Sequence, residues 1–180
     1  MDFKVVTEKL LTAFKKANIR YALMGGYALG LWGVGRATVD IDFLVHRDDL
    51  DKVDNIMRGL SYECKHRSEN VSQYISSLNI LGEVDFLHAF REASLEMINR
   101  AEEKNILGGS LKIKIVKPED LIGLKVQAIK NDPSRKQTDM MDIESLISLH
   151  GKNFDWSLIE IYFKLFDMEK EYKKIKGKMK

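Results

Sequence analysis

The sequence predicts an α/β (α+β) fold, in which a mixed strand–helix core is followed by a helical C-terminal region. Strand-like and helix-like segments alternate over roughly the first two thirds of the 180 residues, whereas the remainder carries helical patterns only. Hydrophobic residues make up 44% of the chain and charged residues 31%, which is ordinary for a globular protein. A chain of this length can bury a sizeable core.

Hydrophobic spacing, glycine and proline define the expected elements. Apolar residues at helical spacing predict a helix over residues 3–18. The apolar run of residues 21–24 stops at Gly25 and Gly26, so we expect a strand that enters a tight turn. Asp48 suits an N-cap, and Pro118 suits a first helical turn. The further expected elements are a helix over 27–32, a loop over 33–38, a strand over 39–45, a helix over 48–58, paired strands over 71–81 and 83–87, a helix over 92–104, a strand over 111–116, and helices over 118–130, 136–150 and 155–171.

A break at residues 131–134, which includes Pro133, suggests a division of the chain. On this reading residues 1–132 form the core, and residues 133–180 form a helical region with a basic tail. The break could equally be an ordinary loop within one compact unit. The net charge is +2, and removing the five lysines of the last eight residues leaves −3. We expect this tail to be a solvated, frayed terminus, with a nucleic-acid contact as the minority alternative.

The composition also bears on where the protein works. No apolar run approaches the ~20 residues that a membrane-spanning helix needs. The N-terminus lacks the charged-then-apolar layout of a signal peptide. Cys64 is the only cysteine, so neither an intrachain disulfide nor a thiolate metal cluster can form. We therefore expect a cytoplasmic protein with no membrane partner.

Asp40 and Asp42 alternate with apolar residues along the expected strand 39–45. Side chains at i and i+2 of a strand project from the same face, so the two carboxylates lie together. Such a pair can bridge divalent cations, and Mg²⁺ favours a few carboxylates plus phosphate oxygens. Without a positive partner, mutual repulsion and desolvation would penalise the pair. The alternative is an exposed edge strand that carries two solvated aspartates.

Gly25 and Gly26 come about fifteen residues before this strand. A residue without a Cβ lets the backbone approach a ligand closely. If a helix starts at this turn, its free N–H groups make an anion site. A phosphate-binding turn would then stand close in sequence to a metal-binding strand, although a Gly-Gly pair alone is most often a simple turn.

Two segments resemble a known family. Residues 24–29, Met-Gly-Gly-Tyr-Ala-Leu, and residues 36–43, Arg-Ala-Thr-Val-Asp-Ile-Asp-Phe, look like the signature of the polymerase-beta-type nucleotidyltransferase superfamily. The family pattern is a Gly-Gly or Gly-Ser turn, an Asp-x-Asp strand and a third acidic residue on a neighbouring strand. The resemblance implies a small mixed β-sheet flanked by helices as the nucleotidyltransferase core.

The resemblance implies catalytic, metal-ligating roles for three residues. Asp40 and Asp42 would each ligate Mg²⁺ or Mn²⁺, and Asp85, within Glu-Val-Asp-Phe-Leu, best matches the third acid. Asp85 would help to bind the catalytic metal and could accept the proton of the attacking hydroxyl. Glu83 shares its strand face, so the choice between the two is a judgement, which we make for Asp85 because it stands between apolar neighbours.

The resemblance also implies nucleotide-binding residues. Gly25 and Gly26 would hold the triphosphate. Arg36, just before the metal strand, is placed for a phosphate contact, with a surface loop arginine as the alternative. Thr38 is a further candidate, although it could merely shape the turn. Lys125 matches a lysine thought to meet nucleotide phosphate, with a solvent-facing helix position as the alternative.

The later motifs are similar to those of one subgroup, the abortive-infection (type IV toxin-like) nucleotidyltransferases. They comprise residues 119–128, Arg135 and residues 139–143. Asp139 and Asp142 lie on one helical face, and we expect them to hydrogen-bond Arg135 or to cap the helix. Membership of this subgroup would allow a toxin–antitoxin role with a cognate antitoxin as partner.

The implied reaction moves an NMP from an NTP to a hydroxyl acceptor, which could be RNA, a protein or a small molecule. It would proceed by in-line phosphoryl transfer, with catalysis resting on positioning and charge neutralisation. The alternative is a catalytically inactive binding or regulatory module with the same fold. The retention of all three acids favours the enzyme.

Overall fold

The computed structural model describes residues 1–177, which divide into two compact units. Unit 1 comprises residues 1–28 and 36–116, and unit 2 comprises residues 29–35 and the chain from residue 117 onward. The predicted division of the chain between residues 132 and 133, within one compact unit, stays a prediction. Lys178 and Lys180 of the predicted basic tail lie outside the described residues.

Unit 1 contains a sheet and the helices that cover it. A short 3₁₀ turn (Arg47–Asp49) precedes its second long helix. In chain order its elements are α1 (Phe3–Ala17), β1 (Tyr21–Met24), the start of α2 (Gly25–Leu31), β2 (Asp40–His46), α3 (Leu50–Gly59), β3 (Glu63–Arg67), β4 (Val71–Ile75), β5 (Glu83–Ala89), α4 (Glu92–Asn99), β6 (Glu102–Ile106) and β7 (Leu111–Ile115).

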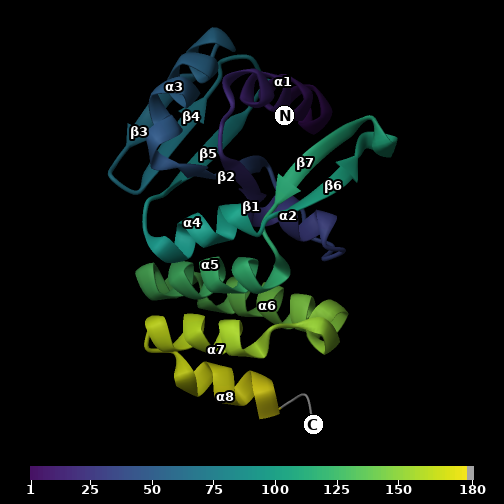
Figure 1. Ribbon diagram of the computed structural model, residues 1–180, viewed down its shortest axis with the longest axis vertical. Helices are drawn as coiled ribbons and strands as arrows, with labels where there is room; N and C mark the ends of the chain where they lie inside the picture. The colour runs from purple at the N-terminus through teal and green to yellow at the C-terminus, as the bar shows by residue number, and fades with distance from the viewer. Residues whose placement is uncertain (178–180) are drawn as a thin grey trace. The chain divides into compact units, whose positions relative to one another are not determined.

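The seven strands form one mixed sheet in the order β3-β4-β5-β2-β1-β7-β6 (Figure 1). At its centre, β2 pairs in parallel with β5 and antiparallel with β1, and β1 pairs in parallel with β7. Towards the edges, the pairs β3–β4, β4–β5 and β6–β7 are antiparallel. The predicted α/β class with a mixed sheet is confirmed.

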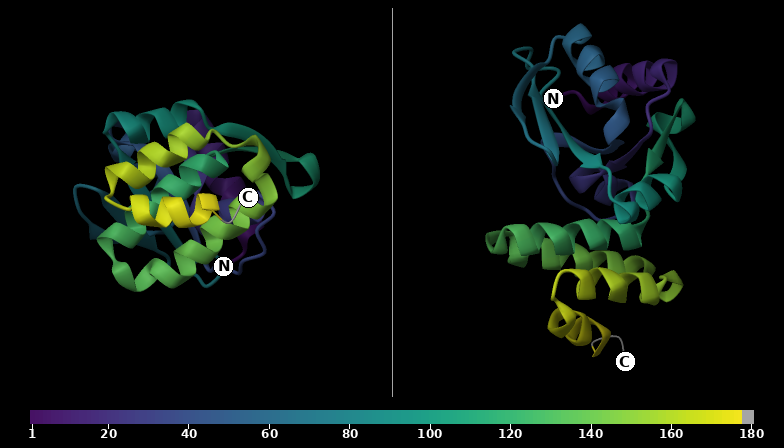
Figure 2. Two further views of the ribbon diagram at one scale, coloured as in Figure 1. Left: turned by 90° about the horizontal axis from the view of Figure 1, so that it is seen from below. Right: turned by 60° about the vertical axis from the view of Figure 1, so that its left-hand side comes forward.

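Helices cover both faces of the sheet in unit 1. Figures 1 and 2 show α1 and α3 together on one face, and α4 lies against β1 and β2 on the other. Phe14 of α1 packs edge-on against Phe43 of β2, with ring centroids 5.3 Å apart, and Phe43 stacks on Phe86 of β5. All three rings are fully buried. Burying a side chain of this size stabilises the fold by about 1.5–3 kcal/mol.

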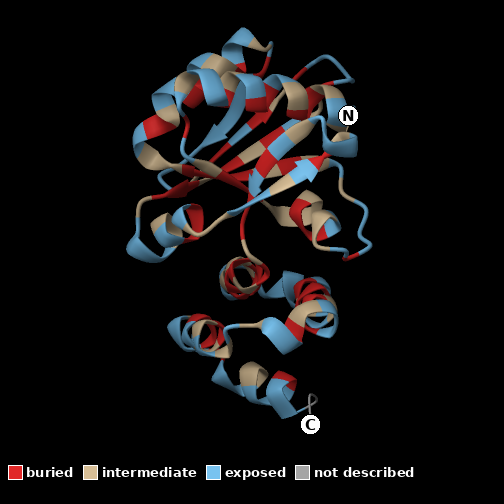
Figure 3. Ribbon diagram, turned by 45° about the vertical axis from the view of Figure 1, so that its right-hand side comes forward, coloured by how far each residue is buried: buried red, intermediate tan, exposed pale blue. Residues whose placement is uncertain are grey.

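Unit 2 is helical, as predicted for the C-terminal region. Its helices after residue 116 are α5 (Pro118–Asn131), α6 (Lys136–His150), α7 (Trp156–Leu165) and α8 (Glu169–Gly177). α5 packs against α6 and α7, and α7 packs against α8 (Figure 2). Figure 3 shows the buried residues of these helices gathered on the faces that they turn to one another. A Cβ at Gly123 would lie 2.6 Å from the ring of Tyr162, so glycine permits the close approach of α5 and α7.

The segment of residues 29–35 also belongs to unit 2. His150 of α6 places Nε2 2.7 Å from the carbonyl oxygen of Trp32, and the two rings meet edge-on. Leu29 and Val34 are buried, with 0% and 6% of their surface exposed. Helix α2 therefore begins in unit 1 and ends in unit 2.

Several boundaries differ from the predicted ones. α2 begins at Gly25 itself, and β4 ends at Ile75, well before residue 81. α3 begins only at Leu50, and Asp48 lies in the preceding 3₁₀ turn, so it is not the N-cap. The predicted helix over 92–104 is wrong at its end, because Glu102–Ile106 pairs with β7 as strand β6.

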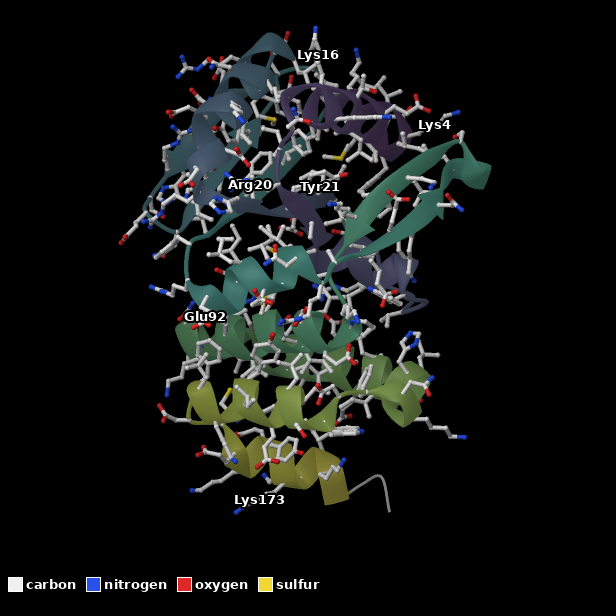
Figure 4. All side chains as sticks on the ribbon, viewed as in Figure 1. Lys4, Lys16, Arg20, Tyr21, Glu92 and Lys173 are labelled. Carbon is white, nitrogen blue, oxygen red and sulfur yellow. The ribbon has the colours of Figure 1, made fainter. Side chains whose placement is uncertain are left out.

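At the C-terminus, the predicted helix over 155–171 is two helices, because Asp167 adopts a left-handed backbone conformation (φ 55°) between α7 and α8. Part of the predicted frayed tail is helical as well. Lys173, Lys174 and Lys176 lie on α8, and Figure 4 shows Lys173 extending outward from it. The ammonium of Lys176 lies 3.6 Å from the centre of the Trp156 ring. Among residues 1–177, every helix is too short or too polar to span a bilayer.

Candidate active site

Four carboxylates meet on one face of the sheet where β2 and β5 begin. Asp40 pairs with Glu83, and Asp42 pairs with Asp85, across the parallel β2–β5 ladder. Paired residues on neighbouring strands lie about 5 Å apart and share a face, so the four side chains form a two-by-two group. We call Asp40, Asp42, Glu83 and Asp85 the acid cluster.

The row that contains Asp42 and Asp85 continues across the sheet. Asp42 is paired with Met24 of β1 on one side, and Asp85 is paired with Gln73 of β4 on the other. Gln73 is paired in turn with His66 of β3. The amide Nε2 of Gln73 donates a hydrogen bond of 3.1 Å to Oδ2 of Asp85. The acid cluster is thus flanked by an uncharged hydrogen-bond donor.

The Gly25–Gly26 turn packs directly on this row. Gly25 has φ +69°, and a Cβ at this position would lie 1.8 Å from Oδ2 of Asp42. A Cβ at Gly26 would lie 2.6 Å from Oγ1 of Thr38. The structure therefore requires glycine at both positions so that Asp42 and Thr38 can lie against the backbone of the turn. The phosphate-binding role of the two glycines stays a prediction.

Thr38 contacts the acid cluster as well as the turn. Its Oγ1 donates a hydrogen bond of 2.6 Å to Oδ1 of Asp40. This contact accounts for Thr38 without a nucleotide, and its predicted nucleotide-binding role stays untested. Arg36, two residues earlier, is exposed, and its phosphate contact likewise stays a prediction.

The electrostatics of Asp85 follow from its neighbours. Half-burial raises the pKa of Asp85, the hydrogen bond from Gln73 lowers it, and the charges of Asp40 and Glu83 raise it again, so that the pKa lies above its usual value. A carboxylate shifted in this direction by other carboxylates gains from a nearby cation. Glu83 is exposed, whereas Asp85 is half-buried, and the choice between them as the third acid stays a prediction.

The acid cluster fits a hard divalent cation by its chemistry. Carboxylate oxygens are the ligands that Mg²⁺ and Mn²⁺ prefer, and a cation would offset the repulsion that raises the pKa of Asp85. Among residues 1–177, no three histidine, cysteine, aspartate or glutamate side chains are already arranged to hold an ion. Asp40, Asp42 and Asp85 stay the predicted ligands.

Lys125 lies in unit 2 and is buried, with 8% of its surface exposed. Its ammonium donates hydrogen bonds of 2.8 Å to Oδ1 of Asp139 and 2.5 Å to Oδ2 of Asp142. Arg135 donates a bond of 3.0 Å to Oδ2 of Asp139, which confirms the expected contact between Asp139 and Arg135. We call Lys125, Arg135, Asp139 and Asp142 the ion network. The solvent-facing alternative for Lys125 is wrong, and its nucleotide-binding role stays a prediction.

The sequence alone does not identify Gln73 as a partner of Asp85. Alternation along β4 places Gln73 between two apolar residues of the same face, Val71 and Ile75. Its contact with Asp85 depends on the register between β4 and β5. A polar residue that interrupts an apolar face is the only signal that pointed to it.

A family model described as an uncharacterised nucleotidyltransferase matches residues 4–172. The chain belongs to this family. It is accordingly an enzyme that transfers nucleotidyl groups, and the predicted superfamily resemblance is confirmed. No curated protein sequence matches this nucleotidyltransferase significantly.

Solved structures share the fold of this nucleotidyltransferase. The solution structure of the antibiotic-resistance factor ANT(2'')-Ia is similar with a TM-score of 0.66 and 15% identity, over 100% of both chains. The crystal structure of ANT(2'')-Ia in complex with adenylyl-2''-tobramycin gives 0.66 and 15% identity over 92% of this chain and 97% of that chain. The lincomycin-bound lincosamide antibiotic adenylyltransferase LnuA gives 0.57 and 18% identity over 79% and 95%. At these identities the likeness extends to the fold alone.

Proposed function

We propose that this nucleotidyltransferase moves an NMP from an NTP to a hydroxyl acceptor, and that it depends on Mg²⁺ or Mn²⁺ bound by Asp40, Asp42 and Asp85. The observation that carries the proposal is the β2–β5 register. It sets Asp42 directly beside Asp85, with Asp40 on the same face, next to a glycine turn into which no side chain would fit.

The transfer forms one bond and breaks another. The acceptor oxygen attacks the α-phosphorus of the NTP, the bond from that phosphorus to the bridging oxygen breaks, and pyrophosphate leaves with its electron pair. Bound divalent cations would lower the pKa of the attacking hydroxyl and neutralise the charge of the departing pyrophosphate. The protein has little covalent chemistry to perform and acts mainly by positioning.

The chain's own residues supply binding and proton transfer. Asp85 would accept the proton of the attacking hydroxyl, because its carboxylate lies beside Asp42 on the face where the acceptor must arrive. Gly25 and Gly26 would let the triphosphate approach the backbone at the end of β1. Arg36 is the side chain of unit 1 that we assign to a phosphate contact, and the nucleotide-binding role of Lys125 stays a prediction from the family resemblance.

We infer that a small hydroxylated molecule is the acceptor class to test first. Two proteins that share the fold were solved with such compounds, ANT(2'')-Ia with adenylyl-2''-tobramycin and LnuA with lincomycin. ANT(2'')-Ia also matches this chain over 100% of both chains. RNA and protein remain the other acceptor classes of the test.

The test is a transfer assay with each NTP labelled at the α-phosphate, in the presence of Mg²⁺ or Mn²⁺. Pools of hydroxylated small molecules, cellular RNA and cellular protein serve as acceptors, and the double variant Asp40→Asn/Asp42→Asn is the control. Label in one pool, present only with the unmodified protein and lost with EDTA, supports the proposal and names the acceptor class. Absence of label from every pool would count against it and favour the inactive binding module.

The toxin role and the antitoxin partner are separate proposals that rest on the resemblance to the abortive-infection subgroup. They predict that expression arrests growth and that the product of a neighbouring gene restores it. Growth arrest that persists in the Asp40→Asn/Asp42→Asn variant would show that any toxicity is independent of nucleotidyl transfer. Unimpaired growth on expression would remove the toxin proposal without touching the enzyme.

A further inference from the structure

Two uncharged side chains flank the acid cluster, and each donates one hydrogen bond to a carboxylate. Thr38 Oγ1 reaches Oδ1 of Asp40 at 2.6 Å, and Gln73 Nε2 reaches Oδ2 of Asp85 at 3.1 Å. Gln73 lies on β4, beyond β5 in the sheet, whereas Thr38 lies against the turn that follows β1. The two donors therefore reach the acid cluster from opposite flanks.

The fold places the two donors in different ways. The side chain of Thr38 packs on Gly26 so closely that a Cβ there would lie 2.7 Å from its own Cβ. A side chain packed in this way loses little further freedom when its partner binds a ligand. The antiparallel register sets Gln73 opposite Asp85, and the exposed side chain of Gln73 is oriented by its hydrogen bond to Asp85.

A carboxylate has two oxygens, and a donor that occupies one of them sets the direction of the other. In the acid cluster this matters, because like charges at this spacing repel and would rotate apart. Rotation of the carboxylates away from one another would weaken the binding of an ion between them, and the two donors limit such rotation.

We propose that Thr38 and Gln73 are positioning residues for the metal site. Each takes one oxygen of its aspartate, Oδ1 of Asp40 or Oδ2 of Asp85, and leaves the other oxygen for a divalent cation. The inference rests on the proposed function, since it assumes that Asp40 and Asp85 are metal ligands. It assigns Thr38 to the orientation of Asp40 in place of a nucleotide contact.

The test measures Mn²⁺ binding to the full chain by isothermal titration calorimetry, without nucleotide. Thr38→Val and Gln73→Met remove the donors at nearly constant shape. The matched controls are Thr12→Val, which removes an exposed hydroxyl bonded to a helix carbonyl, and Asn105→Leu, which removes an amide from an exposed strand position. Thermal unfolding of every variant runs in parallel, and Thr38→Ser tests for rescue.

We expect each donor variant to bind Mn²⁺ about 10-fold more weakly, in line with the usual effect of removing a hydrogen bond to a metal ligand. The controls and Thr38→Ser should bind like the unmodified protein, and the thermal midpoints of the donor variants should stay close to its own. In the transfer assay the donor variants should raise the Mn²⁺ concentration needed for half-maximal rate more than they lower the maximal rate.

Two outcomes would overturn the inference in different ways. Donor variants that bind Mn²⁺ within about twofold of the unmodified protein would refute the inference alone, provided that the unmodified protein binds Mn²⁺ and transfers nucleotide. An unmodified protein that binds no Mn²⁺ would refute the proposed metal site and the inference with it. If Thr38→Val fails to fold, Gln73→Met decides.

Discussion

Asp85 of unit 1 and Asp139 of unit 2 are both carboxylates withdrawn from water, yet their pKa values move in opposite directions. Burial raises the pKa of each. For Asp85, the charges of Asp40 and Glu83 add to this effect, and the amide of Gln73 offsets only part of it. The pKa of Asp85 therefore lies above the ordinary value of an aspartate.

For Asp139, the fold supplies the positive charges. Hydrogen bonds and charge from Lys125, followed by those from Arg135, outweigh burial and bring the pKa of Asp139 below its ordinary value. The ion network thus carries its own counter-charges, whereas Asp85 lies among further carboxylates. Asp139 links α6 to α5 through Lys125, whereas Asp85 is a proposed ligand of a divalent cation, and the difference predicts opposite responses to substitution.

The largest expected effect is on activity, in the acid cluster. Asp85→Asn should lower nucleotidyl transfer by roughly 10³-fold, because metal-assisted charge stabilisation is worth several kcal/mol. The free energy of unfolding should stay the same or rise, since the substitution removes a charge that its neighbours repel. The transfer assay and urea unfolding measure the two quantities. If Asp85→Asn lowered both stability and activity, the contrast between Asp85 and Asp139 would be wrong.

The ion network should respond in the opposite way. Lys125→Met leaves Asp139 and Asp142 buried without their ammonium, and breaking such a pair destabilises a fold by about 3–5 kcal/mol. The matched control is Lys130→Met on the same helix, which removes an exposed ion pair to Asp167 and should cost no more than about 1 kcal/mol. Urea unfolding compares the two. Equal losses would show that burial of the network contributes nothing.

Asp49 of unit 1 is a second buried carboxylate that lies beside positive charges. The direction of its pKa shift predicts how stability changes with pH. Burial would raise the pKa of Asp49, but hydrogen bonds from the side chain and backbone of Arg20 and from Lys52 outweigh it and bring the pKa to about 2. Figure 4 shows Arg20 at the start of β1. Because the folded pKa is depressed, the stabilisation is present above the unfolded value near 3.8 and is lost as pH falls towards 2.

The contribution of Asp49 is about 2 kcal/mol at neutral pH, from the size of the shift. Arg20→Met should therefore destabilise the protein at pH 7 and have a much smaller effect near pH 2. Lys65→Met, which removes an exposed ion pair to Glu63, is the control and should be nearly silent at both. Unfolding curves at the two pH values check this, and a penalty for Arg20→Met that does not change with pH would contradict it.

The glycine turn should lose activity out of proportion to its loss of stability. In Gly25→Ala the new Cβ would lie 1.8 Å from Oδ2 of Asp42, so Asp42 must move, and the backbone conformation (φ +69°) alone costs an alanine about 1–2 kcal/mol. Gly30→Ala on the same helix has no atom within 4 Å of the new Cβ and should stabilise by about 0.5–1 kcal/mol. Thermal unfolding and the transfer rate are measured for both variants, Gly25→Ala and Gly30→Ala. Full activity in Gly25→Ala would show that the position of Asp42 is not critical.

The sequence was a good guide wherever the signal is local. The strand at Tyr21–Met24 and the helix at Lys136–His150 were expected with the bounds that the structure has, because each lies next to a local break in the chain, the Gly25–Gly26 pair or the turn that includes Pro133. Period-2 spacing likewise sufficed to place Asp40 and Asp42 on one face of a strand. These inferences need no knowledge of neighbouring strands.

The sequence was a poor guide wherever contacts between residues far apart in the chain determine the structure. Glu102–Ile106 carries charges that suit a helix, and only its pairing with β7 makes it a strand. Glu63–Arg67 is exposed throughout, so the sequence has no alternating apolar pattern there that would predict a strand. The proximity of Asp85 to Asp42 was inferred from the family resemblance, and the contact with Gln73 depends on strand register. The burial of Lys125 depends on how α5 packs against α6.

The path of the chain between the two units has a consequence for any shortened form of the protein. Residues 29–35 are grouped with the C-terminal helices, so a premature stop or a proteolytic cut after Val116 would not release an intact catalytic half. It would strip the cover from Leu29 and Val34 and leave them at the far end of the helix that begins with Gly25 and Gly26. Such a fragment presents apolar surface that favours aggregation and degradation.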